Sequence, residues 1–184
     1  MRSALLVAGL PGSGKSLFSE AARRAGLPVV SMGDAVRQEA VRRGLGTDAE
    51  ALARLARELR LARGEAAVAE LVLESLPDAP IVVIEGVRSP AEVGLFRRYF
   101  GRVALVAIHA SPRTRYLRLL KRGRQDDPRT WDEFVQRDKR ELSLGIGEVI
   151  ALADYMLVNE GMSRDEFLER CAEALRRILR DLST

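Results

Sequence analysis

The chain has 184 residues, a length that suits one compact domain with a sizeable core. Apolar residues make up 47% of it and charged residues 30%, which excludes a disordered or fibrous protein. No apolar run approaches the roughly 20 residues that cross a bilayer. The single cysteine, Cys171, excludes an internal disulfide and a cysteine-cluster metal site. We therefore expect a cytoplasmic protein without a membrane partner.

The basic residues predict no nucleic-acid partner. Their excess over acidic residues amounts to a net charge of only +4. Three of them are lysines (Lys15, Lys121 and Lys139) and the other 27 are arginines, many of which alternate with glutamates along predicted helices. With aromatic residues at 5%, this pattern is more typical of solvated helix faces than of a surface for a phosphate backbone.

The predicted elements alternate between strand and helix along the chain. Short apolar runs rich in Val and Ile predict strands that are covered on both faces, at 4–8, 28–31, 81–85, 103–109 and 155–158. Amphipathic stretches predict helices at about 14–25, 33–43, 48–62, 65–76, 90–99, 112–122, 131–143 and 163–181. The alternation predicts an α/β fold with a parallel sheet wrapped by helices.

The first predicted strand runs into a phosphate-binding loop. Gly9-Leu10-Pro11-Gly12-Ser13-Gly14-Lys15-Ser16 matches the pattern G-x-x-x-x-G-K-[ST] between a strand and a helix. Glycines let successive backbone N–H groups face one oxyanion, Lys15 can bridge the β- and γ-phosphates, and Ser16 can ligate Mg²⁺. We expect ATP and Mg²⁺ as cofactors, with the nucleotide bound by Gly9, Leu10, Pro11, Gly12, Ser13, Gly14, Lys15, Ser16 and Leu17.

Charged residues follow two other predicted strands. Glu85 ends the third strand, where an acid can lie beside Mg²⁺, and Arg88 follows three residues later. Asp34 and Arg37 follow the second strand. Arg37 and Arg88 can hold an acceptor phosphate with their planar guanidinium groups. The alternatives are a solvent-exposed acid at Glu85, a helix cap at Asp34 and a solvated charge at Arg37.

A cationic segment surrounds the polar stretch 123–130. A mobile segment of this kind can stabilise the charge of a transferring phosphoryl group and exclude water from it. The alternative is a solvated face, which is the usual reading of a charge run. Its basic residues are Arg118, Lys121, Arg122, Arg124, Arg137 and Arg140.

Together these blocks resemble the adenylate-kinase-like branch of P-loop nucleoside monophosphate kinases. The phosphate loop, Ser-x-Gly-Asp-x-x-Arg at 31–37, the acid-Gly-x-Arg block at 85–88, Arg-x-Asp-Asp at 124–127 and the closing segment 153–161 follow in the family's order. More narrowly, His109-Ala110-Ser111-Pro112, Arg122-Gly123-Arg124 and the segment 145–151 resemble an archaeal set of uncharacterised adenylate-kinase-related proteins. The resemblance spans nearly the whole chain.

The resemblance implies a three-layer fold and a set of roles. It implies one P-loop kinase domain over 1–184, a five-stranded parallel sheet in the order 2-3-1-4-5 with helices on both faces, an acceptor-binding helical excursion at 33–76 and a short lid region at 120–142. The implied substrate-binding residues are Asp34, Arg37 and Arg88, and the implied metal residues are Ser16 and Glu85. The implied catalytic residues are Lys15, Asp34, Arg88, Arg122, Arg124 and Arg137.

Departures from the family pattern concern the metal and the acceptor. Glu85 stands where the family usually has aspartate, and the lid is very short. The glutamine that reads adenine in the family is not evident, since Ser89-Pro90-Ala91-Glu92 occupies that region. The pattern therefore does not support adenylate as the acceptor.

The predicted activity is ATP-dependent transfer of the γ-phosphate to a small phosphate-bearing acceptor, with a nucleoside monophosphate as the default. One alternative is a dephospho-coenzyme-A kinase, in which Asp34 would be the base for a ribose hydroxyl. Another alternative is a P-loop ATPase or a nucleotide-responsive binding protein. The sequence leaves open the acceptor, the choice between ATP and GTP, and the oligomeric state.

Overall fold

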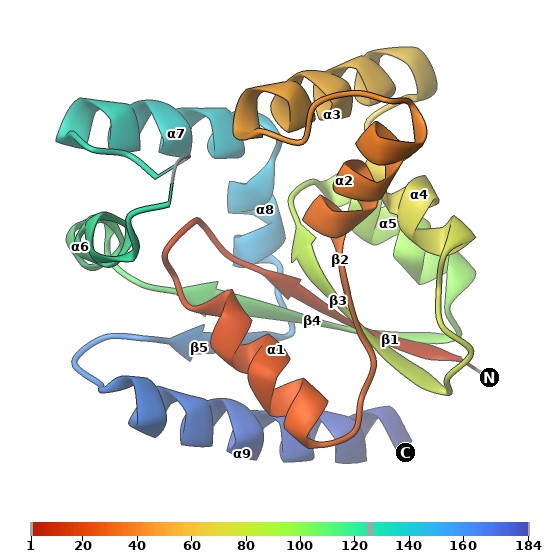
Figure 1. Ribbon diagram of the computed structural model, residues 1–184. Helices are drawn as coiled ribbons and strands as arrows, with labels where there is room; N and C mark the ends of the chain where they lie inside the picture. The colour runs from red at the N-terminus through yellow and green to blue at the C-terminus, as the bar shows by residue number, and fades with distance from the viewer. Residues whose placement is uncertain (1, 125–126, 184) are drawn as a thin grey trace.

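The computed structural model describes residues 2–124 and 127–183 (Figure 1). Asp126 of the predicted Arg-x-Asp-Asp segment lies outside the described residues. The strands are β1 (Ser3–Ala8), β2 (Val29–Ser31), β3 (Ile81–Val87), β4 (Arg102–His109) and β5 (Tyr155–Val158). The helices are α1 (Lys15–Arg24), α2 (Met32–Arg42), α3 (Ala49–Arg63), α4 (Ala67–Glu74), α5 (Pro90–Tyr99), α6 (Pro112–Arg122), α7 (Trp131–Ser143), α8 (Ile146–Ala151) and α9 (Arg164–Ser183).

The strands form one parallel sheet in the order β2-β3-β1-β4-β5 across the described residues, which confirms the predicted order. β1 lies at the centre, and all six of its residues are buried. In the register of the sheet, Leu5 lies between Val83 of β3 and Ala104 of β4. A continuous apolar run is what a strand with two covered faces needs, and this explains why the strands were readable from the sequence.

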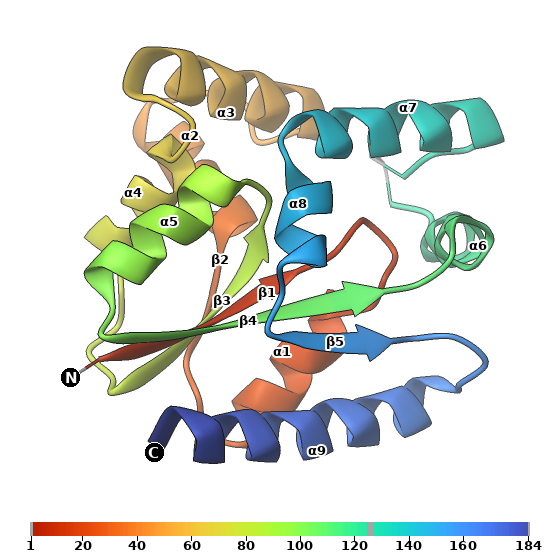
Figure 2. The ribbon, with the colours of Figure 1, turned by 180° about the vertical axis from the view of Figure 1, so that it is seen from behind.

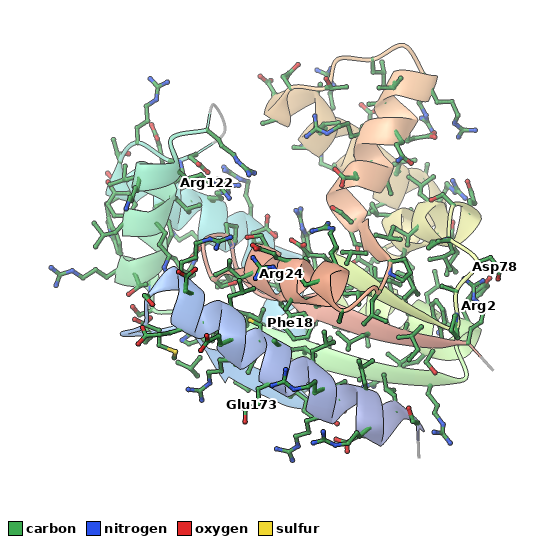
Figure 3. All side chains as sticks on the ribbon, turned by 60° about the horizontal axis from the view of Figure 1, so that its bottom comes forward. Arg2, Phe18, Arg24, Asp78, Arg122 and Glu173 are labelled. Carbon is green, nitrogen blue, oxygen red and sulfur yellow. The ribbon has the colours of Figure 1, made fainter. Side chains whose placement is uncertain are left out.

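Helices cover both faces of the sheet, as Figures 1 and 2 show. α1 and α9 pack on one face, where Phe18 of α1 is completely buried against the sheet (Figure 3). The other face is covered by α2, α4, α5 and α8, and Phe96 of α5 is completely buried there. Successive residues of β1 alternate between these cores, with Leu5 in one and Leu6 in the other. Cys171 is buried in the first core, as expected of a structural thiol, and burial raises its pKa to about 12.

The short helix α8 was not predicted. It spans only Ile146–Ala151, begins after Gly145 in the left-handed region (φ 94°) and contains Gly147. Six residues are too few for a helical period to be recognised, and glycine weakens the signal further. The helix is held by burial instead, since Ile146 and Val149 are 1% and 2% exposed.

The carboxyl ends of the strands meet at one edge, over which α3 and α7 extend (Figures 1 and 2). β3 continues two residues beyond the predicted end, through Gly86 (φ 93°), where its register with β1 shifts. This bulge places Arg88 just past the edge, close to the phosphate loop that follows β1. None of the helices in the described part of the chain is long and apolar enough to cross a membrane.

Candidate active site

The glycines of the phosphate loop are required by close packing as well as by backbone angle. Gly12 (φ 83°) and Gly14 (φ 106°) adopt conformations that side chains rarely allow. A Cβ on Gly12 would lie 2.8 Å from the carbonyl oxygen of Arg115, and a Cβ on Gly14 would lie 2.4 Å from Nδ2 of Asn159. The loop is therefore held between the start of α6 and the end of β5, and α1 begins directly after it, at Lys15.

Lys15 lies inside the curve of the loop. Its ammonium donates to the carbonyl oxygens of Gly9 (2.7 Å) and Leu10 (3.4 Å). Burial lowers the pKa of Lys15 to about 8, an effect that the nearby carboxylate of Glu85 partly offsets. Burial thus disfavours the charged form of this lysine when no anion is bound, and phosphate oxygens would stabilise that form.

A hollow of about 550 Å³ opens beside the loop, and we call it the loop hollow. Of the residues predicted to bind nucleotide, Gly9, Leu10 and Ser13 are not part of its lining, and the carbonyl oxygens of Gly9 and Leu10 accept from Lys15. Its lining includes Pro11, Gly12, Gly14, Lys15, Ser16, Leu17, Glu85, Arg88, Arg118, Arg122, Arg124, Arg137 and Asn159.

Ser16 and Glu85 fit a magnesium ion that is bound together with phosphate. Both line the loop hollow, and their hydroxyl and carboxylate oxygens are the hard ligands that Mg²⁺ prefers. The hydroxyl of Ser19 donates to Glu85, which orients this carboxylate. Among residues 2–124 and 127–183, no three His, Cys, Asp or Glu side chains gather as a metal site. Phosphate oxygens and water would have to supply the remaining ligands.

The predicted lid arginines meet at one carboxylate that the sequence did not single out. Asp127, whose side chain is 2% exposed, accepts from Nε of Arg122 at 2.8 Å and from Nη1 of Arg137 at 3.3 Å. The backbone N–H of Arg124 also donates to it, at 3.0 Å. Although burial raises the pKa of Asp127, these hydrogen bonds and charges outweigh burial and hold the pKa below its usual range. Figure 3 shows Arg122 at the end of α6.

A second hollow, of about 340 Å³, opens between α2, α3 and α7, and we call it the helix hollow. Asp34, Arg37 and Arg88, the predicted substrate-binding residues, all line it. Arg88 and Arg137 line both the loop hollow and the helix hollow, so the hollows adjoin at these guanidinium groups. The structure thus brings together the predicted acceptor arginines and the predicted lid arginine.

The helix cap proposed for Asp34 as an alternative was wrong, because the cap belongs to Ser31. The hydroxyl of Ser31 accepts from the backbone N–H of Asp34 at 3.3 Å, and Asp34 stands in the first turn of α2. Its exposed carboxylate faces the helix hollow instead. Arg37 is not merely solvated, since its Nη1 donates to the carbonyl oxygen of Thr47 at 3.1 Å.

Sequence reasoning missed some of the residues that hold these parts together, and it named Arg118 and Asn159 only as members of larger segments, without their contacts. Arg118 donates to Asn159 (3.0 Å to its carbonyl oxygen and 3.1 Å to Oδ1), and Nδ2 of Asn159 donates to the carbonyl oxygen of Ser13 at 2.9 Å. Burial lowers the pKa of Arg118. Glu141 of α7 lies 3.4 Å from Nε of Arg88 in the helix hollow. The available signals were the arginine spacing on α6 and the polar Asn159 after a strand, and neither was specific.

Arg115 is the most deeply buried of the missed residues, at 2% exposure. It forms a two-pronged ion pair with Asp138 of α7 at 2.8 and 2.5 Å. It also donates to the carbonyl oxygens of Ala110 (3.1 Å) and Pro11 (3.3 Å), and its guanidinium lies 4.9 Å from the centre of the Phe134 ring. This side chain therefore ties α7 to the phosphate loop.

Comparison with known proteins places the chain in a family. A family model described as an AAA domain matches residues 8–134. A UPF0200 protein of Hyperthermus butylicus is 52% identical over 179 residues, covering 96% of this chain and 95% of the relative. A UPF0200 protein of Pyrococcus horikoshii is 48% identical over 181 residues, covering 95% and 97% of the two chains. The chain belongs to the UPF0200 family. The predicted resemblance to an archaeal set is thereby confirmed.

Solved structures similar to this member of the family include P-loop kinases. TT1252 from Thermus thermophilus matches with a TM-score of 0.68 and 23% identity, covering 98% of each chain. Shikimate kinase from Bacteroides thetaiotaomicron matches with a TM-score of 0.61 and 19% identity, over 97% of this chain and 98% of the other. A gluconokinase from Sinorhizobium meliloti matches with a TM-score of 0.59 and 19% identity, over 100% and 98%. The fold is that of P-loop kinases.

Proposed function

We propose that the protein transfers the γ-phosphate of ATP to a small acceptor that itself carries a phosphate, with a nucleoside monophosphate as the class. The observation that carries this proposal is the junction of the hollows at Arg88 and Arg137. A phosphate loop on one side of that junction and Arg37 on the other suit two phosphate groups that face each other. A protein that only hydrolysed ATP would have no use for the second hollow.

The chemistry assigned to each group follows from its position. Lys15 would neutralise the β- and γ-phosphates, and Arg88, Arg122, Arg124 and Arg137 would face the transferring group. Ser16 and Glu85 would hold Mg²⁺, which when bound neutralises charge on the phosphate oxygens. An ionised acceptor phosphate needs no general base, so positioning and charge neutralisation suffice.

Ion pairs within the protein hold the arginines near their working positions. Glu141 keeps Arg88 at the helix hollow, and Asp127 keeps Arg122 and Arg137 at the loop hollow. An incoming phosphate would compete with these carboxylates for the same guanidinium groups, because planar guanidinium binds both anions in a similar geometry. The arginines are thus ordered before substrate arrives, which lowers the entropic cost of assembling the site.

A transfer assay tests the proposal. ATP labelled in its γ-phosphate is incubated with the protein, Mg²⁺ and each of a panel of nucleoside monophosphates and coenzyme-A precursors, and labelled acceptor is separated from free phosphate. We expect labelled acceptor, lost in Arg88→Gln and retained in Arg98→Gln, whose side chain is exposed on α5. Release of free phosphate at one rate, whatever the acceptor, would identify an ATPase instead.

One observation favours a second candidate, phosphorylation of a hydroxyl group as in dephospho-coenzyme-A kinase. Because Ser31 caps α2, the carboxylate of Asp34 is not needed as the cap. It lines the helix hollow, where it could accept a proton from a hydroxyl. Asp34→Asn distinguishes the candidates. Near-complete loss of kcat with an unchanged KM supports a hydroxyl acceptor, whereas a mild loss supports a phosphate acceptor.

A further inference from the structure

Arg60 of α3 lines the helix hollow, and the hydrogen bond that its guanidinium donates to Glu92 is a long one. Its side chain is 17% exposed. Its Nε is buried and has no hydrogen-bond acceptor among the described residues. Its Nη2 lies 3.5 Å from Oε1 of Glu92, the outer limit of a hydrogen bond. Because this contact of Nη2 is long, an acceptor on a ligand in the helix hollow could form a stronger hydrogen bond with the guanidinium than Glu92 does.

Glu92 is not free to present its carboxylate to a ligand. It is completely buried, and its Oε2 accepts from the backbone N–H groups of Arg88 (2.7 Å) and Ser89 (3.2 Å) at the start of α5. The hydroxyl of Ser89 accepts in return from the backbone N–H of Glu92, which completes a capping box. Glu92 thus fixes the backbone of Arg88 and balances the charge of Arg60. Of this pair, the group that remains for a ligand is therefore the donor, Arg60.

Part of the wall around Arg60 is apolar. Leu52 and Ala56 of α3, Val36 of α2 and Val68 of α4 line the helix hollow together with it. The arginines that would hold a phosphate line the same hollow, and its volume of about 340 Å³ lies within the range of small-molecule sites. The hollow therefore combines a cationic part, apolar walls and a cationic donor group at Arg60.

We propose that Arg60 determines acceptor specificity by donating to a carbonyl oxygen of the base, so that the acceptor is a nucleoside monophosphate with a keto base. This inference rests on the proposed function. An exocyclic amino group at the same place is itself a donor, so it could not accept a hydrogen bond from the guanidinium of Arg60. Inosine monophosphate and adenosine monophosphate are a matched test pair, because the first has an oxo group where the second has an amino group.

The test measures binding of each monophosphate to the full chain by calorimetry, with Mg²⁺ and a non-hydrolysable ATP analogue present. We expect inosine monophosphate to bind at least ~10-fold more tightly than adenosine monophosphate. Arg60→Lys keeps a positive charge near Glu92 but removes the Nε donor and the planar fork, and we expect it to bring the ratio to within about 2-fold. Arg57→Lys, at an exposed position one turn earlier on α3, is the matched control and should keep the ratio.

Each other outcome overturns the inference. Equal or tighter binding of adenosine monophosphate by the wild type contradicts it, as does an unchanged ratio in Arg60→Lys. If Arg60→Lys fails to fold, the double variant Arg60→Met with Glu92→Gln removes both charges together and must show the same loss of preference. Transfer of phosphate to both monophosphates without preference contradicts the role of Arg60 in specificity but leaves the proposed function in place. If none of the nucleoside monophosphates in the transfer panel binds or accepts phosphate while ATP is still hydrolysed, the proposed function is overturned as well.

Discussion

The loop hollow and the helix hollow adjoin, yet they are built in different ways. The loop hollow is centred on consecutive residues, 9–17, whose glycines and backbone groups curve around Lys15. The helix hollow is assembled by residues of α2, α3, α4, α5 and α7 together with Gly86 and Arg88 at the end of β3, and these segments lie far apart in the chain. The proposed nucleotide site therefore depends on one short segment, whereas the proposed acceptor site depends on how distant helices pack against one another.

Arg115 donates to the phosphate loop at Pro11 and also pairs with Asp138 of α7, so it connects the loop to a helix that lines the helix hollow. Replacing Arg115 should have the largest effect, because the mostly buried carboxylate of Asp138 is left without its partner. We expect Arg115→Met to lower the free energy of unfolding by about 3–5 kcal/mol, measured by urea denaturation. The control is Arg113→Met, at an exposed position of the same helix. Equal stability of the two variants would contradict the linking role.

Replacing Lys15 tests whether the loop hollow acts separately from the helix hollow. We expect Lys15→Met to lower kcat for phosphate transfer by about 10²–10³-fold, because it removes a charge that faces the transferring group. Binding of the acceptor alone should stay the same, since Lys15 does not line the helix hollow. Lys139→Met, at an exposed position on α7, is the control and should leave kcat as it is. A matching loss of acceptor affinity in Lys15→Met would show that the hollows do not act separately.

Replacing Arg37 tests the same separation in the helix hollow, with acceptor binding as the property that should change. It lines the helix hollow and not the loop hollow. We expect Arg37→Gln to raise the KM of the acceptor about 10-fold, as the loss of a charge-assisted hydrogen bond predicts, and to leave ATP affinity unchanged. Steady-state kinetics with both substrates varied measures this, with Arg54→Gln on the exposed face of α3 as control. A change confined to the KM of ATP would be the contrary finding.

The smallest expected effect concerns Asp127, which holds arginines at the junction. Its pKa is below the usual range in the folded protein, so its contribution to stability is present above about pH 4 and is lost as pH falls through the folded pKa. We expect wild type to be more stable than Asp127→Asn at pH 7, and this difference to shrink as the pH is lowered below about 4. Thermal unfolding of both proteins across that range measures it. A constant difference would contradict the charge-based account.

The sequence predicted the five strands, their order through a family resemblance, and the helices except α8. Of the site, it predicted the phosphate loop and the pairing of Arg37 with Arg88, each of which belongs to a short motif beside a strand end; that Arg137 lines the same hollow comes from the structure. It did not predict the contacts of Arg60. A charge on an amphipathic helix is usually solvated, so sequence alone cannot show which one is buried.

The amino-acid sequence was thus enough for the local features of this protein: where in the chain the strands lie, where glycines allow the loop to curve, and where Lys15 stands. These depend on backbone angles and periods that a few neighbouring residues set. Only the tertiary structure shows that Arg115 reaches Asp138, that Asp127 pairs with Arg122 and Arg137, and that Arg60 lines the helix hollow with its Nε buried and without an acceptor among the described residues. Those outcomes depend on the crossing of helices distant in sequence, where burial makes a charge seek a partner.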